Sequence, residues 1–353
     1  MIKLSPILRE LERRSLPFFI IHTNQHYSQD MDAVFFEELG LPKPLYNLEV
    51  GSGSHGEQTG KMIMALDSIL QRERPDHLYV QGDTNSVIAG ALAAAKVLST
   101  KISHVEAGLR SYDRTMPEEV NRIIADHISD YLFVPTNTEA DILRKEGIPD
   151  EKISIVGNTI VDAVLQNIEI ANANGNALSQ HGVEPQSYHL LTLHRPSNVE
   201  DPVVLQEVLD TIHELGKEKE VTTLFPCHPR TRARIQENGI SLGNTIRISE
   251  PIGYSAMLQL MQNAQLILTD SGGIQEEACI LKVPCVTLRF NTERPDTISV
   301  GGNVLAGNKR DSVLEAARTM LAKNVTWYNP YGDGNTAQRI VDIILRSEKS
   351  SKS

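Results

Sequence analysis

The chain has 353 residues and a mass of 39.1 kDa, which is more than one hydrophobic core usually serves, so two domains are expected. Hydrophobic residues make up 40% and charged residues 22% of the chain, a mix that is typical of a soluble globular protein. The net charge of -11 argues against a nucleic-acid-binding surface, because phosphate backbones are held mainly by clustered Lys and Arg.

No stretch approaches the roughly 20 apolar residues that span a bilayer, and the N-terminus lacks the basic-then-apolar pattern of a signal peptide. We therefore expect a cytoplasmic protein without membrane insertion. The three cysteines, Cys227, Cys279 and Cys285, form no CxxC pair, which indicates a reducing compartment and no structural zinc site. We expect them to be packing residues and predict no metal.

Strand-like runs alternate with helical patterns along the chain, which predicts an α/β fold of two doubly wound, Rossmann-like domains that change near residue 158. The runs are PFFIIHT, DHLYVQG, KISHVE, YLFVPT and KISIVG in the first half and YHLLTLH, TTLFPCH, TIRISE, LILTD and PCVTL in the second. The opening is unusual. The run IKLSPILRELERR has an amphipathic helix pattern where such a domain normally opens with a strand, so the first strand is expected to be missing.

Four acidic residues of the first half are candidates for chemistry. Asp83 follows the run HLYVQG and Glu106 follows ISHV, so both are expected at the carboxyl edge of one sheet. Glu118 and Glu119 follow Pro117 at a predicted helix start. Carboxylates so placed can act as general acid or base, or bind sugar hydroxyls. The alternative, which the sequence leaves equally open, is helix capping by Asp83 and favourable helix-dipole interactions for the two glutamates.

The segment GSGSHG at residues 51–56 satisfies the G-x-G-x-x-G pattern but lies well inside the first domain, so a dinucleotide site is not expected there. The chain continues as GEQTGKM, which lacks the glycine spacing of a Walker A loop and the Ser or Thr that should follow Lys61. We interpret this segment as a flexible loop on the substrate side.

The strongest local pattern is LILTDSGGIQEEACIL at residues 266–281. A buried strand leads into Gly272 and Gly273, which let the backbone approach a ligand, and the helix that follows points free N–H groups at it. Ser271 is expected to cap the helix or to donate its hydroxyl to a phosphate oxygen, and Glu277 to accept ribose hydroxyls. The pattern favours diphosphate binding over the alternative of a simple tight turn.

Positive charge for a diphosphate is available in three other loops that follow strands of the second half. Such loops converge at the carboxyl edge of an open parallel sheet. A single cation in such a loop is more often a surface group, but three converging loops favour a binding role. The cationic and polar residues in the three loops are His194, Arg195 and Asn198 after YHLLTL, His228 and Arg230 after TTLFP, and Arg289 and Arg294 after PCVTL.

Several motifs in one order resemble those of the non-hydrolysing UDP-N-acetylglucosamine 2-epimerases over nearly the full length. The matching segments are QGDTNSV, HVEAGLRS, MPEEVNR, DSGGIQEEACILKVPCVTLR and NTERPDT. The resemblance implies a GT-B fold with the active site in a cleft between two domains. The first domain would comprise residues 1–158 plus a C-terminal helix at 335–349, and the second residues 159–334. It further implies a homodimer, UDP-N-acetylmannosamine as product, no cofactor and a role in polysaccharide biosynthesis.

The resemblance also assigns roles to individual residues. It implies that Asp83, Glu106 and Glu118 are the catalytic carboxylates, and we group His194 with them because it is expected to stabilise the leaving diphosphate. The implied UDP-binding residues are Lys3, His194, Ser271, Gly272, Gly273, Glu277 and Arg294. We add Arg195, Asn198 and Arg289 because they lie in the loops that follow strands of the second half. Some members bind a second UDP-N-acetylglucosamine as activator, for which Gln25, His26 and His228 are the candidates.

The chain departs from the family pattern at three places. The family has a strand and a Gly-Thr-Arg-Pro-Glu turn, with an active-site arginine, before the segment that matches IKLSPIL. Their absence points to a start placed too late in the gene or to a shortened chain, and is expected to leave buried backbone groups unpaired and the site defective. Ser197 stands where the family usually has Glu, and Phe290 where it usually has Asp.

The expected chemistry is elimination of UDP to 2-acetamidoglucal followed by readdition. Two other functions share the nucleotide-binding half of this hypothesis. A GT-B glycosyltransferase would pass the sugar to an acceptor without exchange at C2 of the sugar. A non-catalytic sugar-nucleotide-binding protein would bind UDP without turnover, as the missing strand would favour.

Overall fold

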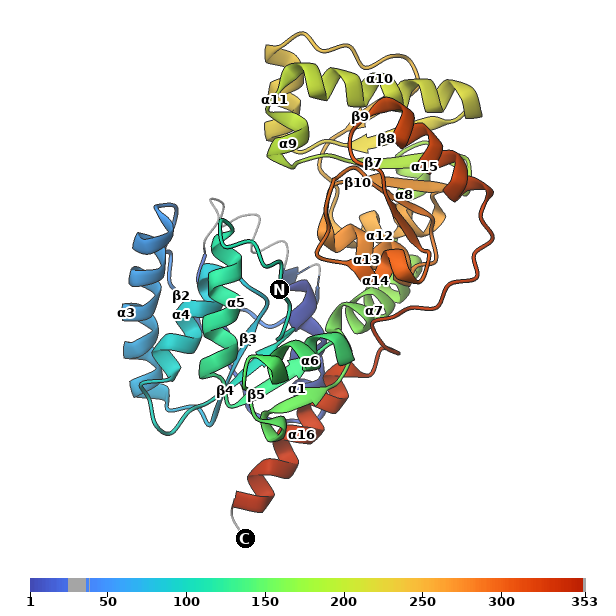
Figure 1. Cartoon of the computed structure of the whole chain (residues 1–353). Coiled ribbons are helices and arrows are strands. Elements are labelled where there is room, and N and C mark those ends of the chain that lie inside the picture. Colours follow the sequence, from blue (N-terminus) through green and yellow to red (C-terminus); the bar gives the residue numbers. More distant parts are fainter. Residues whose placement is uncertain (25–35, 38, 352–353) are drawn as a thin grey trace. The chain divides into compact units, whose positions relative to one another are not determined.

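The computed structural model describes residues 1–24, 36–37 and 39–351, which form two compact units (Figure 1). Unit 1 comprises Met1–Ala163 and Tyr331–Ser353, and unit 2 comprises Val164–Pro330. The chain passes from unit 1 to unit 2 within helix α7 (Thr159–Asn174), a few residues after the change that the sequence predicted near residue 158. Among the described helices, none is both long enough and apolar enough to cross a bilayer.

Unit 1 contains a four-stranded parallel sheet in the order β3-β4-β5-β6 and a separate two-stranded parallel sheet, β1-β2. The sequence did not predict β2. Within the described residues, no strand joins β1 to β3. The strands are β1 (Ile21–His22), β2 (Tyr46–Asn47), β3 (His77–Gln81), β4 (Lys101–Val105), β5 (Tyr131–Val134) and β6 (Ile153–Ile155).

The side chains of these strands alternate between two helical layers, as parallel strands buried on both faces require. Ile102 of β4 packs with α3, α4 and α5, whereas Val105 of the same strand packs with α1 and α16. The helices of unit 1 are η1 (Ile2–Leu4), α1 (Ser5–Arg13), α3 (His55–Glu73), α4 (Asn85–Ala94), α5 (Pro117–Ile128), α6 (Asn137–Lys145), η2 (Asp150–Lys152) and α16 (Thr336–Ser351).

The segment that the sequence analysis interpreted as a flexible loop is helical from His55 onward, so that interpretation was wrong. Ser54 caps α3 by accepting a hydrogen bond from the backbone N–H of Glu57 at 3.3 Å. Gly56 and Gly60 lie inside this helix, and Lys61 forms an ion pair with Glu57 one turn away. The glycines weaken the helix signal in the sequence, but burial of the other face of α3 against α4 stabilises it.

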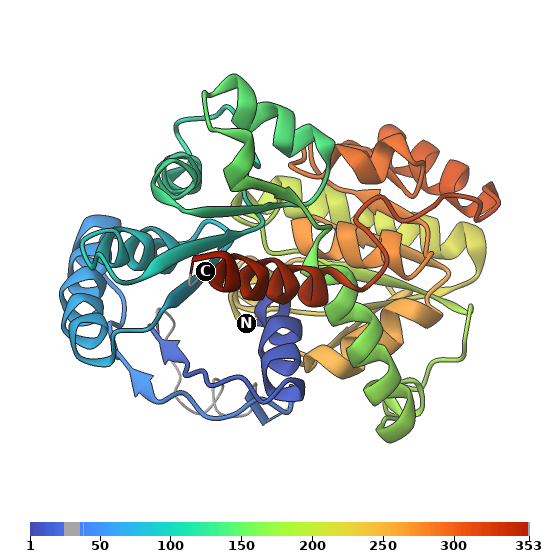
Figure 2. The same cartoon turned by 90° about the horizontal axis from the view of Figure 1, so that it is seen from below.

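Helix α16 brings the end of the chain back to unit 1, where it lies beside α1 (Figure 2). Ile7 of α1 and Ile340 of α16 are fully buried in the core that the two helices share. Asp162, at the start of α7, accepts a hydrogen bond from the backbone N–H of Ala337 at 2.9 Å and so satisfies an otherwise unpaired donor in the first turn of α16.

Unit 2 is built on a six-stranded parallel sheet in the order β12-β11-β10-β7-β8-β9. The sequence predicted five of these strands and missed β12, which is only three residues long. The chain order reverses between β7 and β10, and ligands of open α/β sheets bind beside the carboxyl ends of strands at such a point. The strands are β7 (Tyr188–Thr192), β8 (Thr222–Pro226), β9 (Ile246–Ser249), β10 (Leu266–Thr269), β11 (Cys285–Thr287) and β12 (Asn303–Leu305).

Two hydrophobic cores cover the two faces of this sheet. Leu191 of β7 packs with α10 and α15, whereas its neighbour Leu190 packs with α12 and α13. The helices of unit 2, besides α7, are α8 (Ala177–Gln180), α9 (Pro196–Val199), α10 (Pro202–Lys219), α11 (Pro229–Glu237), α12 (Tyr254–Asn263), α13 (Gly272–Ile280), α14 (Pro295–Ser299) and α15 (Arg310–Ala322).

The three cysteines are free and buried in the core of unit 2. Burial raises the pKa of the Cys227 and Cys279 thiols to about 11 and that of Cys285 further still. Such thiols stay protonated at neutral pH, and they fit the packing role that the sequence predicted.

Candidate active site

Asp270 organises the loop that follows β7 in unit 2. Strands β7 and β10 pair up to Thr192 and Thr269, so His194 and Asp270 emerge side by side at the carboxyl edge. The fully buried carboxylate of Asp270 accepts hydrogen bonds from the backbone N–H groups of His194 and Arg195 at 3.1 and 3.0 Å. Nδ1 of His194 lies 3.0 Å from Oδ1 of Asp270, so this carboxylate also orients the imidazole.

Burial alone would raise the pKa of Asp270, but the His194 side chain, the Arg195 N–H and the Asn198 amide outweigh it and hold the pKa below its usual range. From the sequence, Asp270 was predicted only to end a strand, and its role in holding this loop was not predicted. A signal was available, because an aspartate that directly follows the apolar run LILT is buried and therefore needs several partners.

The N-terminus of α13 has room for a ligand. Gly272 and Gly273 have helical backbone angles outside the left-handed region. A Cβ added to Gly272 would come no closer than 3.8 Å to another side chain, and one added to Gly273 no closer than 4.0 Å. Neither backbone conformation nor packing therefore requires glycine here. The open space beside the helix N–H groups favours diphosphate binding over the tight-turn alternative.

The Ser271 hydroxyl makes no capping hydrogen bond within the described residues, so only the second of the two roles expected for it, donation to a phosphate oxygen, stays open. Glu277 is buried in α13, two helical turns at most from the open end. Its contact with a ribose stays a prediction.

The two arginines expected to bind the diphosphate each have a carboxylate partner in unit 2. Arg289 pairs with Glu293 at 2.8 Å and Arg294 with Glu276 at 2.9 Å. Largely buried guanidinium groups need such partners, because an unpaired buried charge is costly. A diphosphate would therefore share these arginines with the two glutamates, which the sequence analysis did not anticipate.

His228 caps α11 by accepting a hydrogen bond from the backbone N–H of Arg230 at 3.2 Å, so this ring nitrogen is unprotonated. Burial, His194 and Arg230 lower the pKa of His228, in that order. The other two residues predicted for an activator site, Gln25 and His26, lie outside the described residues.

In unit 1, Asp83 follows β3 and is held by an arginine. Its Oδ2 accepts hydrogen bonds from Nη2 and Nε of Arg122 at 2.6 and 3.1 Å, and its side chain is 32% exposed. The N-cap of α4 is Thr84, so Asp83 does not have the capping role that the alternative interpretation gave it. Asp83 is therefore a partly exposed carboxylate that Arg122 holds in a fixed orientation.

Glu106 follows β4, the neighbour of β3, and adopts a left-handed backbone conformation with φ of +68°. Such a conformation is uncommon for a residue with a side chain and is often found at functional sites. Oε1 of Glu106 lies 2.5 Å from Nζ of Lys3 and accepts a hydrogen bond from Nδ2 of Asn158 at 3.3 Å. Lys3, predicted to bind UDP, thus pairs with a candidate catalytic carboxylate.

The structure separates the two glutamates at the start of α5. Glu119 is buried and accepts hydrogen bonds from the backbone N–H groups of Ser111 and Tyr112, both at 2.9 Å, and from Arg122 at 2.8 Å. Its role is structural, because it holds the preceding loop. Glu118 is half-buried and forms no hydrogen bond or ion pair within the described residues, so its carboxylate is available for chemistry.

A buried network joins the turns that carry Asp83 and Glu106. Nε2 of His104 lies 2.9 Å from the carbonyl oxygen of Gly82, and Nδ1 lies 2.7 Å from Asp126. Burial would lower the pKa of His104, but Asp126 raises it overall. Burial would raise the pKa of Asp126, but His104 and Arg110 lower it overall. Both shifts favour the ion pair of His104 and Asp126, which connects the two turns.

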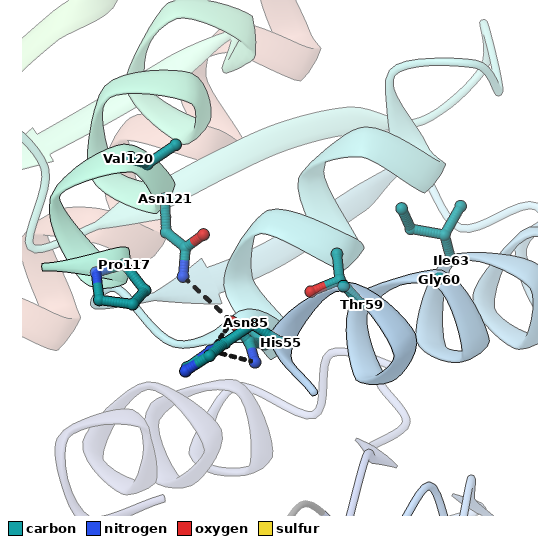
Figure 3. Close-up of a pocket in the computed structure, with 9 residues that line it drawn as sticks. His55, Thr59, Gly60, Ile63, Asn85, Pro117, Val120 and Asn121 are labelled. Carbon is teal, nitrogen blue, oxygen red and sulfur yellow. Dashed lines mark hydrogen bonds between the residues drawn. The ribbon is translucent and has the colours of Figure 1, made fainter. Parts of the chain in front are cut away.

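A hollow of about 470 Å³ opens between α3, α4 and α5, and Asn85 and Asn121 line it (Figure 3). Asn121 donates a hydrogen bond to the carbonyl oxygen of Asp83 at 2.9 Å and contacts Asn85 at 3.4 Å. Nδ2 of Asn85 in turn lies 3.1 Å from Nδ1 of His55. These contacts connect the Asp83 turn to α5, α4 and α3. Within the described residues, no cluster of His, Cys, Asp or Glu is suited to a metal ion.

The His104–Asp126 pair makes the free energy of unfolding of unit 1 depend on pH in the acid range. Because the pKa of folded Asp126 lies below its unfolded value, its contribution to the free energy of unfolding is present above about pH 4 and is lost as the pH falls through the folded pKa. We expect Asp126→Asn to lower the free energy of unfolding at pH 7 by about 3 kcal/mol or more and to flatten the acid slope in urea titrations. Asp141→Asn, in an exposed ion pair, should cost less than about 1 kcal/mol. An unchanged acid slope in Asp126→Asn would contradict the assignment.

Comparisons with known proteins support one family. A family model described as UDP-N-acetylglucosamine 2-epimerase matches residues 9–345. The chain is 52% identical to a UDP-N-acetylglucosamine 2-epimerase of Methanococcus maripaludis, over 99% of this chain and 96% of that protein. It is 41% identical, over 95% of this chain and 93% of that protein, to a UDP-2,3-diacetamido-2,3-dideoxy-D-glucuronate 2-epimerase of Pseudomonas aeruginosa.

A solved structure agrees with the sequence comparison. The crystal structure of the Methanocaldococcus jannaschii UDP-GlcNAc 2-epimerase in complex with UDP-GlcNAc and UDP superimposes with a TM-score of 0.89 at 52% identity. The match covers 98% of this chain and 96% of that chain. With two Rossmann-like units of the GT-B type and a family match along almost its entire length, the chain belongs to the UDP-N-acetylglucosamine 2-epimerase family.

Proposed function

We propose that the chain interconverts UDP-N-acetylglucosamine and UDP-N-acetylmannosamine by eliminating UDP and adding it back. The observation that carries this proposal is the 52% identity, over nearly the whole of both chains, to an enzyme whose crystal structure holds UDP-GlcNAc and UDP. The open N-terminus of α13 beside the Asp270-anchored loop supports the UDP-binding half of the proposal.

The epimerisation reaction requires carboxylates that transfer protons as well as a site that binds the diphosphate. The hydrogen on C2 of the sugar is not next to a carbonyl, so a carboxylate cannot simply remove it and return it to the other face. When the bond between C1 and the UDP oxygen breaks at the same time, positive character at C1 acidifies C2 and UDP accepts the electron pair. The products are 2-acetamidoglucal and UDP. Readdition with protonation on the opposite face gives the epimer.

The roles follow from the local environments. In unit 2, the free N–H groups of α13, the Ser271 hydroxyl and the imidazole of His194 would stabilise the negative charge that develops on UDP. In unit 1, Asp83 and Glu106 are each paired with a cation, and Glu118 has no partner within the described residues. One of these three carboxylates removes the C2 proton and another supplies a proton on the opposite face.

The proposed sugar is N-acetylglucosamine, but the 41% relative acts on a diacetamido glucuronate, and Ser197 and Phe290 depart from the usual family residues. The two substrates can be compared directly in deuterated water. We expect UDP-N-acetylglucosamine to acquire deuterium at C2 and to yield the manno epimer, with higher kcat/KM than the glucuronate. UDP release that requires an acceptor, without deuterium at C2, would instead indicate a glycosyltransferase, and binding without exchange an inert protein.

Substitution of the two most accessible carboxylates tests the assignment in unit 1. We expect Asp83→Asn and Glu118→Gln each to lower C2 exchange by about 100-fold or more, since general acid–base catalysis contributes factors of that size. UDP affinity, measured by calorimetry, should change little, because the groups proposed to bind the diphosphate, the N-terminus of α13 and His194, lie in unit 2. Asp141→Asn is the matched control on the surface of unit 1. Full exchange in both variants would show that the assignment is wrong.

The open glycines test the assignment in unit 2. Gly272→Ala should fold normally, because the nearest side-chain atom to its new Cβ is Oε2 of Glu293 at 3.8 Å and because alanine favours helix. It should weaken UDP binding by about tenfold or more, because the methyl group occupies the space in which the diphosphate would contact the helix N–H groups. Gly60→Ala in α3, also in open space, is the matched control and should leave UDP binding unchanged. Equal UDP affinity in both variants would count against the proposed diphosphate position.

We also propose a homodimer, as the family resemblance implies. Light scattering should then give twice the 39.1 kDa of one chain at micromolar concentration, and a mass of one chain at all concentrations would refute it. The cytoplasmic location and the role in polysaccharide biosynthesis stay predictions from the sequence.

A further inference from the structure

We propose that Asn158 is a positioning residue for Glu106, which it keeps ionised and correctly oriented for proton transfer at C2. This inference rests on the proposed function only in that Glu106 is assigned to the proton transfer. The observation behind it is that one amide side chain serves two partners. Oδ1 of Asn158 accepts the backbone N–H of Ile160 at 3.0 Å, and Nδ2 donates to Oε1 of Glu106 at 3.3 Å.

The first contact fixes the second. Ile160 lies in the first turn of α7, where backbone N–H groups have no partner inside the helix, so only the oxygen of the amide can face it. The NH₂ group must then point the other way, toward Glu106. The backbone of Asn158 is also fixed, because its N–H donates to the carbonyl oxygen of Tyr331 at 2.8 Å. The donor therefore reaches Glu106 from a rigid position.

The environment makes this hydrogen bond effective. Asn158 is 4% and Glu106 8% exposed, and a hydrogen bond to a buried carboxylate favours its ionised form. Among the described residues, Lys3 at 2.5 Å and the charged form of His104 also interact with this carboxylate. Lys3 lies in η1 and has a long, flexible side chain, so it stabilises the negative charge of Glu106 without fixing the orientation of the carboxylate. The amide of Asn158 fixes that orientation, because its oxygen is already held by the backbone N–H of Ile160.

The alternative explanation is that Asn158 only caps α7. Two substitutions separate the capping of α7 from the contact with Glu106. Asp and Ser are as good N-cap residues as Asn, so Asn158→Asp and Asn158→Ser should both keep the hydrogen bond to Ile160 and a melting temperature close to that of the wild type. Asn158→Asp, however, replaces the donor toward Glu106 by a carboxylate oxygen. Asn158→Ser removes the donor without adding charge, because its hydroxyl is too short to reach both partners.

The kinetic test uses C2 exchange of UDP-N-acetylglucosamine in deuterated water as a function of pH. We expect Asn158→Asp to lower kcat at pH 7 by about 100-fold and Asn158→Ser by about tenfold, with KM changed by less than about threefold. The limb of the pH profile that reports Glu106 should move to higher pH in Asn158→Asp, because a like charge beside a carboxylate raises its pKa. A residue that only caps a helix would leave both kcat and the profile unchanged. If Asn158→Asp does not fold, Asn158→Ser alone decides between these outcomes.

A second measurement does not depend on activity. The carboxyl carbon of Glu106 can be titrated by ¹³C NMR and identified by its absence in Glu106→Gln. We expect its pKa to rise by about one unit or more in Asn158→Asp and by less in Asn158→Ser. An unchanged pKa in both variants, or a raised pKa with wild-type kcat, overturns the inference. If the wild-type protein itself shows no C2 exchange, the proposed function fails, and the titration alone then decides whether Asn158 controls the ionisation of Glu106.

Discussion

The parallel direction of the strands is the constraint on which the rest of the structure depends. In a parallel sheet every strand ends at the same edge, so residues far apart in sequence are brought together by strand order alone. In unit 2 this brings the loop after β7 next to the turn after β10, and in unit 1 it brings the turn after β3 next to the turn after β4. Polar residues in these turns need partners, and buried carboxylates supply them.

Two such carboxylates have corresponding roles in the two units. Asp270 fixes the His194 loop in unit 2, and Asp126, through His104, fixes the turns of Asp83 and Glu106 in unit 1. Cationic and N–H partners lower the pKa of each carboxylate by more than burial raises it. His194, Asp83 and Glu106 are thus held by partners within the protein, which lowers the cost of organising them during the reaction.

Much of this arrangement could be predicted from the sequence, because apolar runs and turn residues are local signals. The α/β class, ten of the strands and the start of α5 at Pro117 follow from periodicity and from residues such as Pro and Gly. The pattern around Gly272 and Gly273 pointed correctly to a helix that follows a buried strand. The missed strands, β2 and β12, have two and three residues and carry too short a pattern to be detected.

The partners of the site residues could not be predicted, because they depend on tertiary contacts. Nothing local indicates that Arg122 holds Asp83, that Glu276 holds Arg294, or that Asn158 reaches Glu106 across 52 residues of sequence. The helix α3 was mistaken for a loop because Gly56 and Gly60 lie in its first two turns, whereas its stability comes from packing. Similarly, Glu118 and Glu119 look equivalent in sequence, and only the fold shows that one is buried by the loop that it holds.

The central claim is that the bond between C1 of the sugar and UDP breaks reversibly while the C2 proton is exchanged. It can be tested with UDP-N-acetylglucosamine that carries ¹⁸O in the oxygen between C1 and the β-phosphorus, incubated with the protein in deuterated water. The account predicts that ¹⁸O moves into non-bridging positions of the β-phosphate in substrate that has acquired deuterium at C2. Deuterium at C2 with the label retained entirely in the bridge would contradict it.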